Sequence, residues 1–305
     1  MVVLTRVSTK RLKEGTIGRF VYLRLAVLIL LWAANWSLTK SVLSYISPSS
    51  FVLWRFCGAA VIMAAITIAR RQSLLPASGE RARLAVIGIL QIALCLGIST
   101  FGLAYVGAGR AAVLLYTMQL WSLPLGWLIA GERVSGMGLL GGLAVFFGLL
   151  LFMNPMLVNW HDPKVLFGNA LLLTSSLCWA LGACLYRRYE WQTSFWSQVF
   201  WQVLWSGVVI GTVIPVLGQR RPVVWNPAVV GVLVYNWLGT TALCYLWWGK
   251  VLSVMRVSRA GQFLALTPVT AVLISTALTG EPVTISIVIS IILIAGGICL
   301  AVRGK

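Results

Sequence analysis

Acidic residues and histidine are scarce in this sequence, which restricts the chemistry that the chain can perform. Six aspartates and glutamates and one histidine occur among 305 residues, against 24 lysines and arginines. All seven fall in the N-terminal tail, in predicted turns or at the ends of apolar segments: Glu14, Glu80, Glu132, Asp162, Glu190, Glu281 and His161. None of the apolar segments therefore contains a carboxylate pair, a Ser–His arrangement or a set of metal ligands. We expect no catalytic residue, no metal site and no cofactor.

Cysteine pairs and nucleotide-binding loops are missing as well. The six cysteines lie inside apolar segments without Cys-x-x-Cys spacing, so we interpret them as small buried residues. No GxxxxGK[ST] loop occurs, and the Gly-Ala-Gly run at 107–109 follows no predicted strand, which excludes a dinucleotide-binding unit. We expect no nucleotide partner.

Apolar sequence is what the chain has in abundance: 60% of its residues are hydrophobic and its mean hydropathy is +0.93. About 20 helical residues cross a hydrocarbon core about 30 Å thick. Ten stretches of roughly this length are predicted near residues 21–40, 50–69, 84–106, 111–130, 136–153, 166–186, 194–217, 229–249, 260–279 and 284–302. The first stretch lacks the small-residue cleavage site of a signal peptide, so we interpret it as a transmembrane helix that is retained in the protein. The sequence predicts an all-α integral membrane protein with ten transmembrane helices.

The basic residues are divided unequally between the two sides that these helices define. With the N-terminus inside, the inside segments hold 17 of them: Arg6, Lys10, Arg11, Lys13, Arg19, Arg70, Arg71, Arg81, Arg83, Arg133, Arg187, Arg188, Lys250, Arg256, Arg259, Arg303 and Lys305. The outside segments hold five: Lys40, Arg110, Lys164, Arg220 and Arg221. The positive-inside rule then predicts that both termini are cytoplasmic. The net charge of +18 is thus an orientation signal that favours lipid headgroups as partners and disfavours nucleic acid.

The two halves of the chain repeat one another. Residues 110–152 align without a gap with residues 259–301, at an offset of 149 positions, so that the Gly-Glu pair ending at Glu132 meets the pair ending at Glu281. Trp32 and Trp179 pair at an offset of 147, each within the first span of its half. Such a duplication predicts two homologous units.

The predicted organisation is a half at residues 1–153, an outer loop at 154–165 and a second half at 166–305. Each half has five spans, and because five is odd, the second half enters the membrane from the opposite face. Inverted repeats of this kind are typical of secondary transporters, and some channels share them.

Ten spans in two halves, a tryptophan within spans 1 and 6, and a Gly-Glu turn ending spans 4 and 9 resemble the EamA branch of the drug/metabolite transporter superfamily. The likeness covers nearly the whole chain, and the duplicated Gly-Glu turn is its most specific part. Within that branch, the Trp-rich, basic sequence is most similar to the bacterial aromatic-amino-acid exporters of the YddG type. The resemblance implies a basket-like bundle with a central cavity between the halves.

Polar and aromatic side chains inside the spans are the candidates for the wall of that cavity, because lipid offers them no hydrogen-bond partner. In span 1, Trp32, Asn35 and Trp36 share one helical face. The full set of expected substrate-binding residues is Trp32, Asn35, Trp36, Gln91, Ser99, Tyr116, Gln119, Trp179, Trp237, Thr241, Tyr245 and Gln262. The alternative is that these side chains only hold helices together.

Three further residues inside spans bear on the mechanism. Pro124 and Pro268 fall in spans 4 and 9, where a proline kinks a helix, and we interpret them as gating or kink positions. Arg55 lies in the outer part of span 2, and we expect it to snorkel to the interface or pair with a carbonyl group; binding of the substrate is the less favoured alternative.

The inverted repeat predicts a secondary transporter that works by alternating access. The resemblance implies one that lies in the bacterial inner membrane, works as a monomer and exports aromatic or other neutral amino acids, or similar metabolites. A broad-specificity drug or metabolite exporter is the alternative within transport. A lipid translocase or scramblase is the alternative of another class.

Overall fold

Helices provide the regular secondary structure of this protein in a computed structural model that describes residues 19–132, 135–153, 161–216, 222–279 and 285–303. Within these ranges no strand occurs. The helices are α1 (Arg19–Val42), α2 (Pro48–Ala69), α3 (Arg81–Gly88), η1 (Ile89–Leu94), α4 (Cys95–Tyr105), α5 (Ala108–Tyr116), α6 (Met118–Ala130), α7 (Gly136–Met153), α8 (Pro163–Arg188), α9 (Phe195–Val216), α10 (Pro227–Tyr235), η3 (Asn236–Leu243), α11 (Cys244–Leu252), α12 (Val257–Leu264), α13 (Leu266–Thr279) and α14 (Ile285–Arg303). Glu14 and Glu281 lie outside the described residues, as do residues 154–160 of the loop expected at 154–165.

Among the described residues, six helical segments are long and apolar enough to cross a membrane. They cover Arg19–Val42, Pro48–Ala69, Arg81–Tyr105, Arg110–Ala130, Pro163–Arg188 and Pro227–Leu252, and shorter apolar helices occupy Gly136–Phe152 and Ile285–Leu300. Helices therefore form where the apolar pattern predicts them, with ends that differ by a few residues.

Four of the predicted spans are not continuous α-helices. The segments at 81–105 and 227–252 each contain a stretch of π-helix, η1 and η3. The segments at 108–130 and 257–279 are each interrupted at one residue, Thr117 and Ala265. No signal that we used in the sequence predicts the π-helical stretches. They matter because π-helix within an α-helix occurs frequently at functional sites.

Three helices begin with a polar N-cap residue followed by proline. The side chains of Ser47, Asp162 and Asn226 accept hydrogen bonds from backbone N–H groups two or three residues further on, at 3.2, 2.9 and 2.9 Å. Each cap supplies a partner for an otherwise free N–H group, and the following proline has no N–H group to satisfy. These starts are therefore fixed by local sequence.

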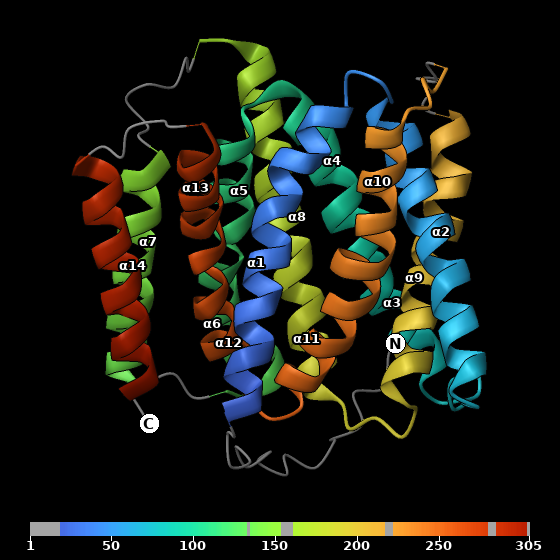
Figure 1. Ribbon diagram of the computed structural model, residues 1–305. Coiled ribbons are helices and arrows are strands. Elements are labelled where there is room, and N and C mark those ends of the chain that lie inside the picture. The colour runs from blue at the N-terminus through green and yellow to red at the C-terminus, as the bar shows by residue number, and fades with distance from the viewer. Residues whose placement is uncertain (1–18, 133–134, 154–160, 217–221, 280–284, 304–305) are drawn as a thin grey trace.

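The helices pack as one bundle, in which Figure 1 shows α7 with α14 on one side, α2 with α9 on the other, and α1 and α8 between them. The contact of α7 with α14 is close: a Cβ atom on Gly297 would lie 2.5 Å from the carbonyl oxygen of Gly141. The largest buried apolar cluster lies between the two pairs and includes residues of α1, α5, α8 and α11.

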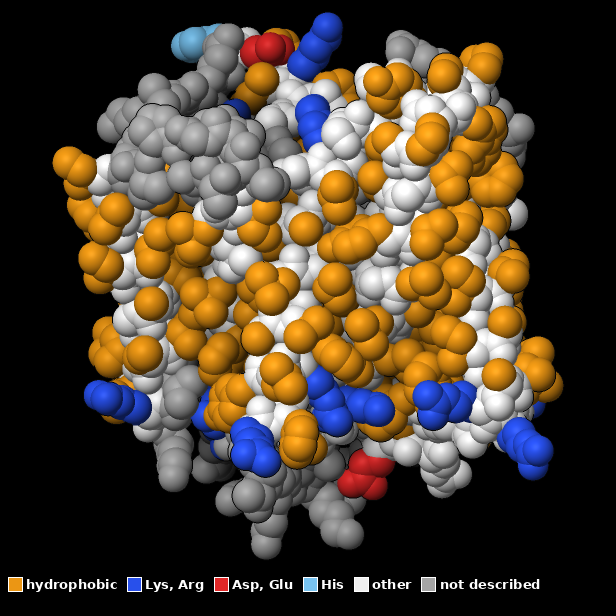
Figure 2. All heavy atoms as spheres, in the orientation of Figure 1, with side chains coloured by type: hydrophobic (Ala, Val, Ile, Leu, Met, Phe, Trp, Pro, Cys, Tyr) orange, Lys and Arg blue, Asp and Glu red, His pale blue; other side chains and the backbone are white. Residues whose placement is uncertain are grey.

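The surface of the bundle has an apolar girdle with charges at its ends. Figure 2 shows apolar side chains across the middle of the molecule and a row of basic side chains near its lower end. Val61 and Leu128 are each 70% exposed, as side chains that face lipid would be. We call the lower end the basic face; α1 begins and α14 ends there (Figure 1), and it carries Arg70, Arg71, Arg81, Arg83, Arg187, Arg188 and Arg256.

The Gly-Glu turn on the basic face holds two distant segments together. Gly131 has a φ of +66°, a left-handed conformation that glycine adopts without strain. The turn directs the buried carboxylate of Glu132 to the start of α12, where it accepts hydrogen bonds from the Val257 N–H at 2.8 Å and the Ser258 hydroxyl at 2.8 Å. A carboxylate at a helix N-terminus pairs with free N–H groups and with the positive end of the helix dipole.

Glu80 performs a similar role at the turn before α9. Its carboxylate accepts hydrogen bonds from the backbone N–H groups of Gln192 at 2.7 Å and Thr193 at 3.1 Å, and from the Thr193 hydroxyl at 2.5 Å. Burial alone would raise its pKa, but these hydrogen bonds and the nearby charge of Arg83 outweigh burial and hold the pKa of Glu80 below its ordinary value. In the described part of the chain, every acidic residue lies outside the helices, as the sequence predicts.

We predict that Glu80→Gln lowers the thermal stability of the purified protein in a manner that depends on pH. A lowered folded-state pKa gives stability that is complete above the ordinary value of about 4.3 and is lost as the pH falls through the folded-state pKa. The variant should lose roughly 1–2 kcal/mol near pH 7, and the difference from the unmodified protein should shrink below about pH 4. Glu190→Gln, at an exposed site, is the control. If Glu80→Gln lost as much stability below pH 4 as near pH 7, the assignment of a lowered pKa to Glu80 would be contradicted.

Candidate functional site

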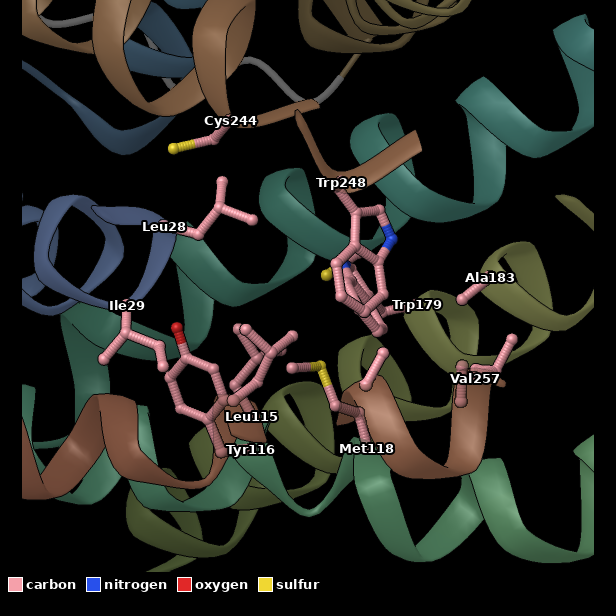
Figure 3. Packing of buried hydrophobic residues seen from close by; sticks show 14 of the residues in the cluster. Leu28, Ile29, Leu115, Tyr116, Met118, Trp179, Ala183, Cys244, Trp248 and Val257 are labelled. Carbon is pink, nitrogen blue, oxygen red and sulfur yellow. The ribbon is translucent and has the colours of Figure 1, made fainter. Parts of the chain in front are cut away.

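Four aromatic side chains meet in the interior of the bundle and form what we call the central aromatic cluster: Trp32 of α1, Trp179 of α8, and Tyr245 and Trp248 of α11. The ring of Trp32 lies edge-on to the other three, at centroid distances of 6.5, 6.2 and 6.3 Å. Trp179 and Trp248 are 4.8 Å apart and tilted, and Figure 3 shows them side by side. Three of these residues were expected in the cavity wall; Trp248 was not.

Hydrogen bonds from side chains to backbone carbonyls join α1 to η3 and to the end of α10. The indole N–H of Trp32 donates to the carbonyl oxygen of Thr240 at 3.2 Å. One turn earlier, the hydroxyl of Tyr235 donates to the carbonyl oxygen of Leu31 at 2.5 Å. Because a π-helix departs from the regular α-helical ladder, it makes a backbone carbonyl available to a side chain of another helix.

A small pocket adjoins the cluster on the side of η1 and α9. It is lined by Gln91, Tyr186, Val199, Gln202, Tyr245, Trp248 and Gly249, and has room for about one water molecule. The hydroxyl of Tyr245 donates to the carbonyl oxygen of Gln91 at 3.0 Å. The side-chain N–H groups of Gln91 and Trp248 are buried and have no hydrogen-bond partner among the described residues. Two unpaired donors favour a hydrogen-bond acceptor, such as water or an oxygen of a solute, in this pocket.

Arg55 is buried in the bundle, and here the structure corrects the sequence-based expectation. Its side chain is 3% exposed and does not snorkel to an interface. It points to η3, where its Nη2 donates to the Thr240 hydroxyl at 3.2 Å and its Nε to the Thr241 hydroxyl at 3.5 Å. The partners are hydroxyl groups of a π-helix that follows some 180 residues later, and sequence proximity gives no sign of them.

Gln119 and Gln262 form a second polar group, between α6, α7 and α12. Gln119 packs against Gly261, and both polar atoms of its side chain are buried without a partner in the described part of the chain. The side-chain amide of Gln262 donates to the carbonyl oxygen of Gly138 at 3.5 Å, while its own oxygen has no partner among the described residues. Whether these amides contact a solute stays a prediction.

The remaining expected cavity residues are spread around the cluster. Trp36 and Tyr116 are buried in the same apolar core, and Figure 3 shows the Tyr116 hydroxyl directed toward Ile29 of α1. Asn35 accepts a hydrogen bond from Thr39 at 3.4 Å, and Ser99 donates to its own helix at 3.2 Å. Trp237 lies against α2, where its indole donates to the carbonyl oxygen of Trp54 at 2.9 Å. Thr241 faces Arg55.

The two prolines differ in their effect on the helix. The helix α6 runs continuously across Pro124, whereas Pro268 follows the interruption at Ala265 by three residues. Proline removes the hydrogen bond to the carbonyl four residues earlier, which is Leu264, so Pro268 accounts for an interruption at that point. The interruption at Thr117 lies seven residues before Pro124 and is not explained by it. A gating role for either proline stays a prediction.

Two residues of the site were missed from the sequence, Trp248 and Thr240. Trp248 belongs to a Trp-Trp pair at 247–248 on the same predicted span as Tyr245, which is three residues earlier and so shares its face. That spacing could have identified it. Thr240 acts through its backbone carbonyl as well as its hydroxyl, and the sequence carries no sign of the first role.

Comparison with known proteins shows the family to which this chain belongs. The profile of the EamA-like transporter family matches residues 19–154 and again residues 166–303. Similar proteins include the uncharacterized transporter YoaV of Bacillus subtilis, 25% identical over 91% of this chain and 95% of its own length, and the uncharacterized transporter YyaM of the same organism, 27% identical over 92% and 93%. A crystal structure of a protein with 18% identity superimposes over 92% of this chain and 96% of its own with a TM-score of 0.77, which shows a shared fold.

We predict that Trp32→Ala weakens binding of an aromatic solute by a factor of about 2 to 12. A well-formed ring pair contributes about 0.5–1.5 kcal/mol beyond area burial, and 1.4 kcal/mol is about tenfold in affinity. The measurement is the dissociation constant of L-phenylalanine for purified protein. Trp32→Phe, which keeps a ring but loses the hydrogen bond to Thr240, should give a smaller effect.

Trp127→Ala is the matched control, because Trp127 is 66% exposed on the girdle. Its binding constant should equal that of the unmodified protein. If folded Trp32→Ala binds L-phenylalanine as tightly as Trp127→Ala does, then the central aromatic cluster only packs helices together and does not bind the solute.

Proposed function

Because the chain belongs to the EamA-like transporter family, we propose that it is a secondary transporter that exports aromatic or other neutral amino acids across a bacterial inner membrane. The family and the relatives YoaV and YyaM are named as transporters, and the apolar helices make this chain a multi-pass membrane protein. The substrate class, the direction and the alternating-access mechanism are the proposal.

The central aromatic cluster is the observation that carries the substrate class. Trp32 comes from the part of the chain covered by the first family match, and Trp179, Tyr245 and Trp248 come from the second. A flat solute that enters between these rings replaces one ring contact by another, so little packing energy is lost. The unpaired N–H groups of Gln91 and Trp248 lie beside the cluster and would receive polar atoms of the solute.

The mechanism that we propose is the rocking of two inverted five-helix halves about this cluster. The family profile matches twice, and the irregular segments recur in both parts of the chain. The π-helices begin at Ile89 and Asn236, 147 positions apart, and the single-residue interruptions at Thr117 and Ala265 are 148 positions apart. These offsets are close to the 149 of the sequence repeat. Interrupted helices at matching positions of two halves are typical of the substrate site of secondary transporters.

We further propose that transport runs down the solute gradient as a monomer, without coupling to protons. A proton-coupled carrier needs a group inside the membrane that binds and releases a proton, usually Asp, Glu or His. The described acidic residues lie in turns, where the carboxylate of Glu80 already binds backbone N–H groups of Gln192 and Thr193, and that of Glu132 binds the start of α12. The basic face would be cytoplasmic, since it carries the seven arginines named above.

We predict counterflow of L-phenylalanine in reconstituted vesicles without any gradient of pH or sodium. Vesicles loaded with unlabelled L-phenylalanine should accumulate labelled L-phenylalanine or L-tryptophan transiently, and glutamate should compete poorly. Vesicles that contain Trp32→Ala at equal density are the control for the site.

Two outcomes would favour the alternatives instead. Uptake of a cationic dye but not of amino acids would indicate a broad drug exporter. Transfer of labelled lipid between leaflets, without amino-acid counterflow, would indicate a scramblase. Strict dependence on an imposed proton gradient would contradict uncoupled transport.

A further inference from the structure

Arg55 is a buried positive charge for which the surrounding helices provide no negative partner. It lies seven residues after the start of α2, about 10 Å along the helix axis. The ionisable side chains around it are Tyr235, Tyr245, Cys95 and Cys244, all of which are neutral near pH 7. In the described part of the chain, no carboxylate is among them. A cation inside a membrane protein is rare and normally faces a partner or a substrate pathway.

Two hydroxyl groups of η3 accept hydrogen bonds from Arg55, fewer than its guanidinium group can donate. A guanidinium group has five N–H donors in a planar fork that matches a carboxylate. Here the hydroxyls of Thr240 and Thr241 accept at 3.2 and 3.5 Å, and the second distance is at the limit of a hydrogen bond. If the role of Arg55 were only to hold α2 against η3, a neutral donor would do so without the large cost of burying a charge.

Arg55 and the central aromatic cluster meet at one residue. The hydroxyl of Thr240 accepts from Arg55, and its backbone carbonyl accepts from the indole of Trp32. Tyr245, which lies against Trp32, is also among the ionisable neighbours of Arg55. The π-helix η3 therefore holds a cation and an aromatic wall next to each other, which is the arrangement that a solute with a carboxylate and a side chain requires.

We propose that Arg55, oriented by the hydroxyls of Thr240 and Thr241, binds the carboxylate of the transported solute. This inference rests on the proposed function, and it adds that the solute must carry a carboxylate: amino acids and other carboxylic acids are substrates, and the corresponding amines or amides are poor ones. A bidentate carboxylate supplies the negative charge that Arg55 lacks and leaves the solute side chain toward Trp32 and Tyr245.

The test compares acids with their amides, which differ only in the carboxylate. The pairs are L-phenylalanine with L-phenylalaninamide and L-alanine with L-alaninamide. Their dissociation constants are measured on the full-length purified protein from the ligand-induced rise in unfolding temperature. Unmodified protein should prefer each acid by about ten- to a hundredfold, the range for hydrogen bonds between charged groups.

Arg55→Met should abolish this preference, so that acid and amide bind equally. Arg55→Lys, which keeps the charge but not the planar fork, should retain part of it. Arg303→Met, at an exposed helix end, is the control and should behave like the unmodified protein. If Arg55→Met does not fold, Arg55→Lys and Thr241→Val carry the test, because a residue that only packs would change the stability without changing the ratio of acid to amide binding.

Unchanged acid preference in Arg55→Met, or in both Arg55→Lys and Thr241→Val, would overturn the assignment, as would equal binding of acids and amides by the unmodified protein. Failure of the aromatic preference within the proposed function gives a different pattern. If L-alanine binds as tightly as L-phenylalanine, and Arg55→Met removes the acid preference for both, the carboxylate site stands and the aromatic preference does not.

Discussion

Inside a bilayer, a polar group that finds no partner within the protein has none at all, and this constraint organises the whole interior of the bundle. The π-helix η3 shows how it acts. The carbonyl oxygen of Thr240 is paired with the indole of Trp32, and the hydroxyl of the same residue with Arg55. At the ends of the helices, where water is near, the same need is met by Glu80, Glu132 and the N-cap residues. Unpaired atoms such as the side-chain N–H groups of Gln91 and Trp248 therefore stand out as places prepared for a solute or a water.

A transporter needs an interior that can open, and the structure combines firm and adaptable contacts. The carboxylate of Glu132 at the start of α12 ties the two parts of the chain together on the basic face. The central aromatic cluster, by contrast, is held mainly by ring contacts, which can be exchanged for contacts with the ring of a solute. Interrupted helices at Thr117 and Ala265 provide points where segments could change direction.

Sequence reasoning predicted the helices well because the bilayer imposes a length and an apolar composition that can be read directly, as at Arg19–Val42 and Pro163–Arg188. It also brought together Trp32, Trp179 and Tyr245, since each is an aromatic residue inside a span. It misplaced Arg55, because burial of a cation depends on which hydroxyls a distant helix presents. It could not predict η1 and η3, since a π-helix is stabilised by contacts with neighbouring helices and has no local signature comparable to a proline or an N-cap.

The central claim is that the solute enters among Trp32, Trp179 and Trp248, and its most direct test observes those rings. Protein labelled with 5-fluorotryptophan gives a fluorine NMR signal for each tryptophan, and single Trp→Phe variants assign the signals. On addition of L-phenylalanine, we predict shifts of the Trp32, Trp179 and Trp248 signals, while that of the lipid-facing Trp127 stays unchanged. Unchanged signals for the three cluster tryptophans, at a concentration of L-phenylalanine that saturates counterflow, would contradict the account.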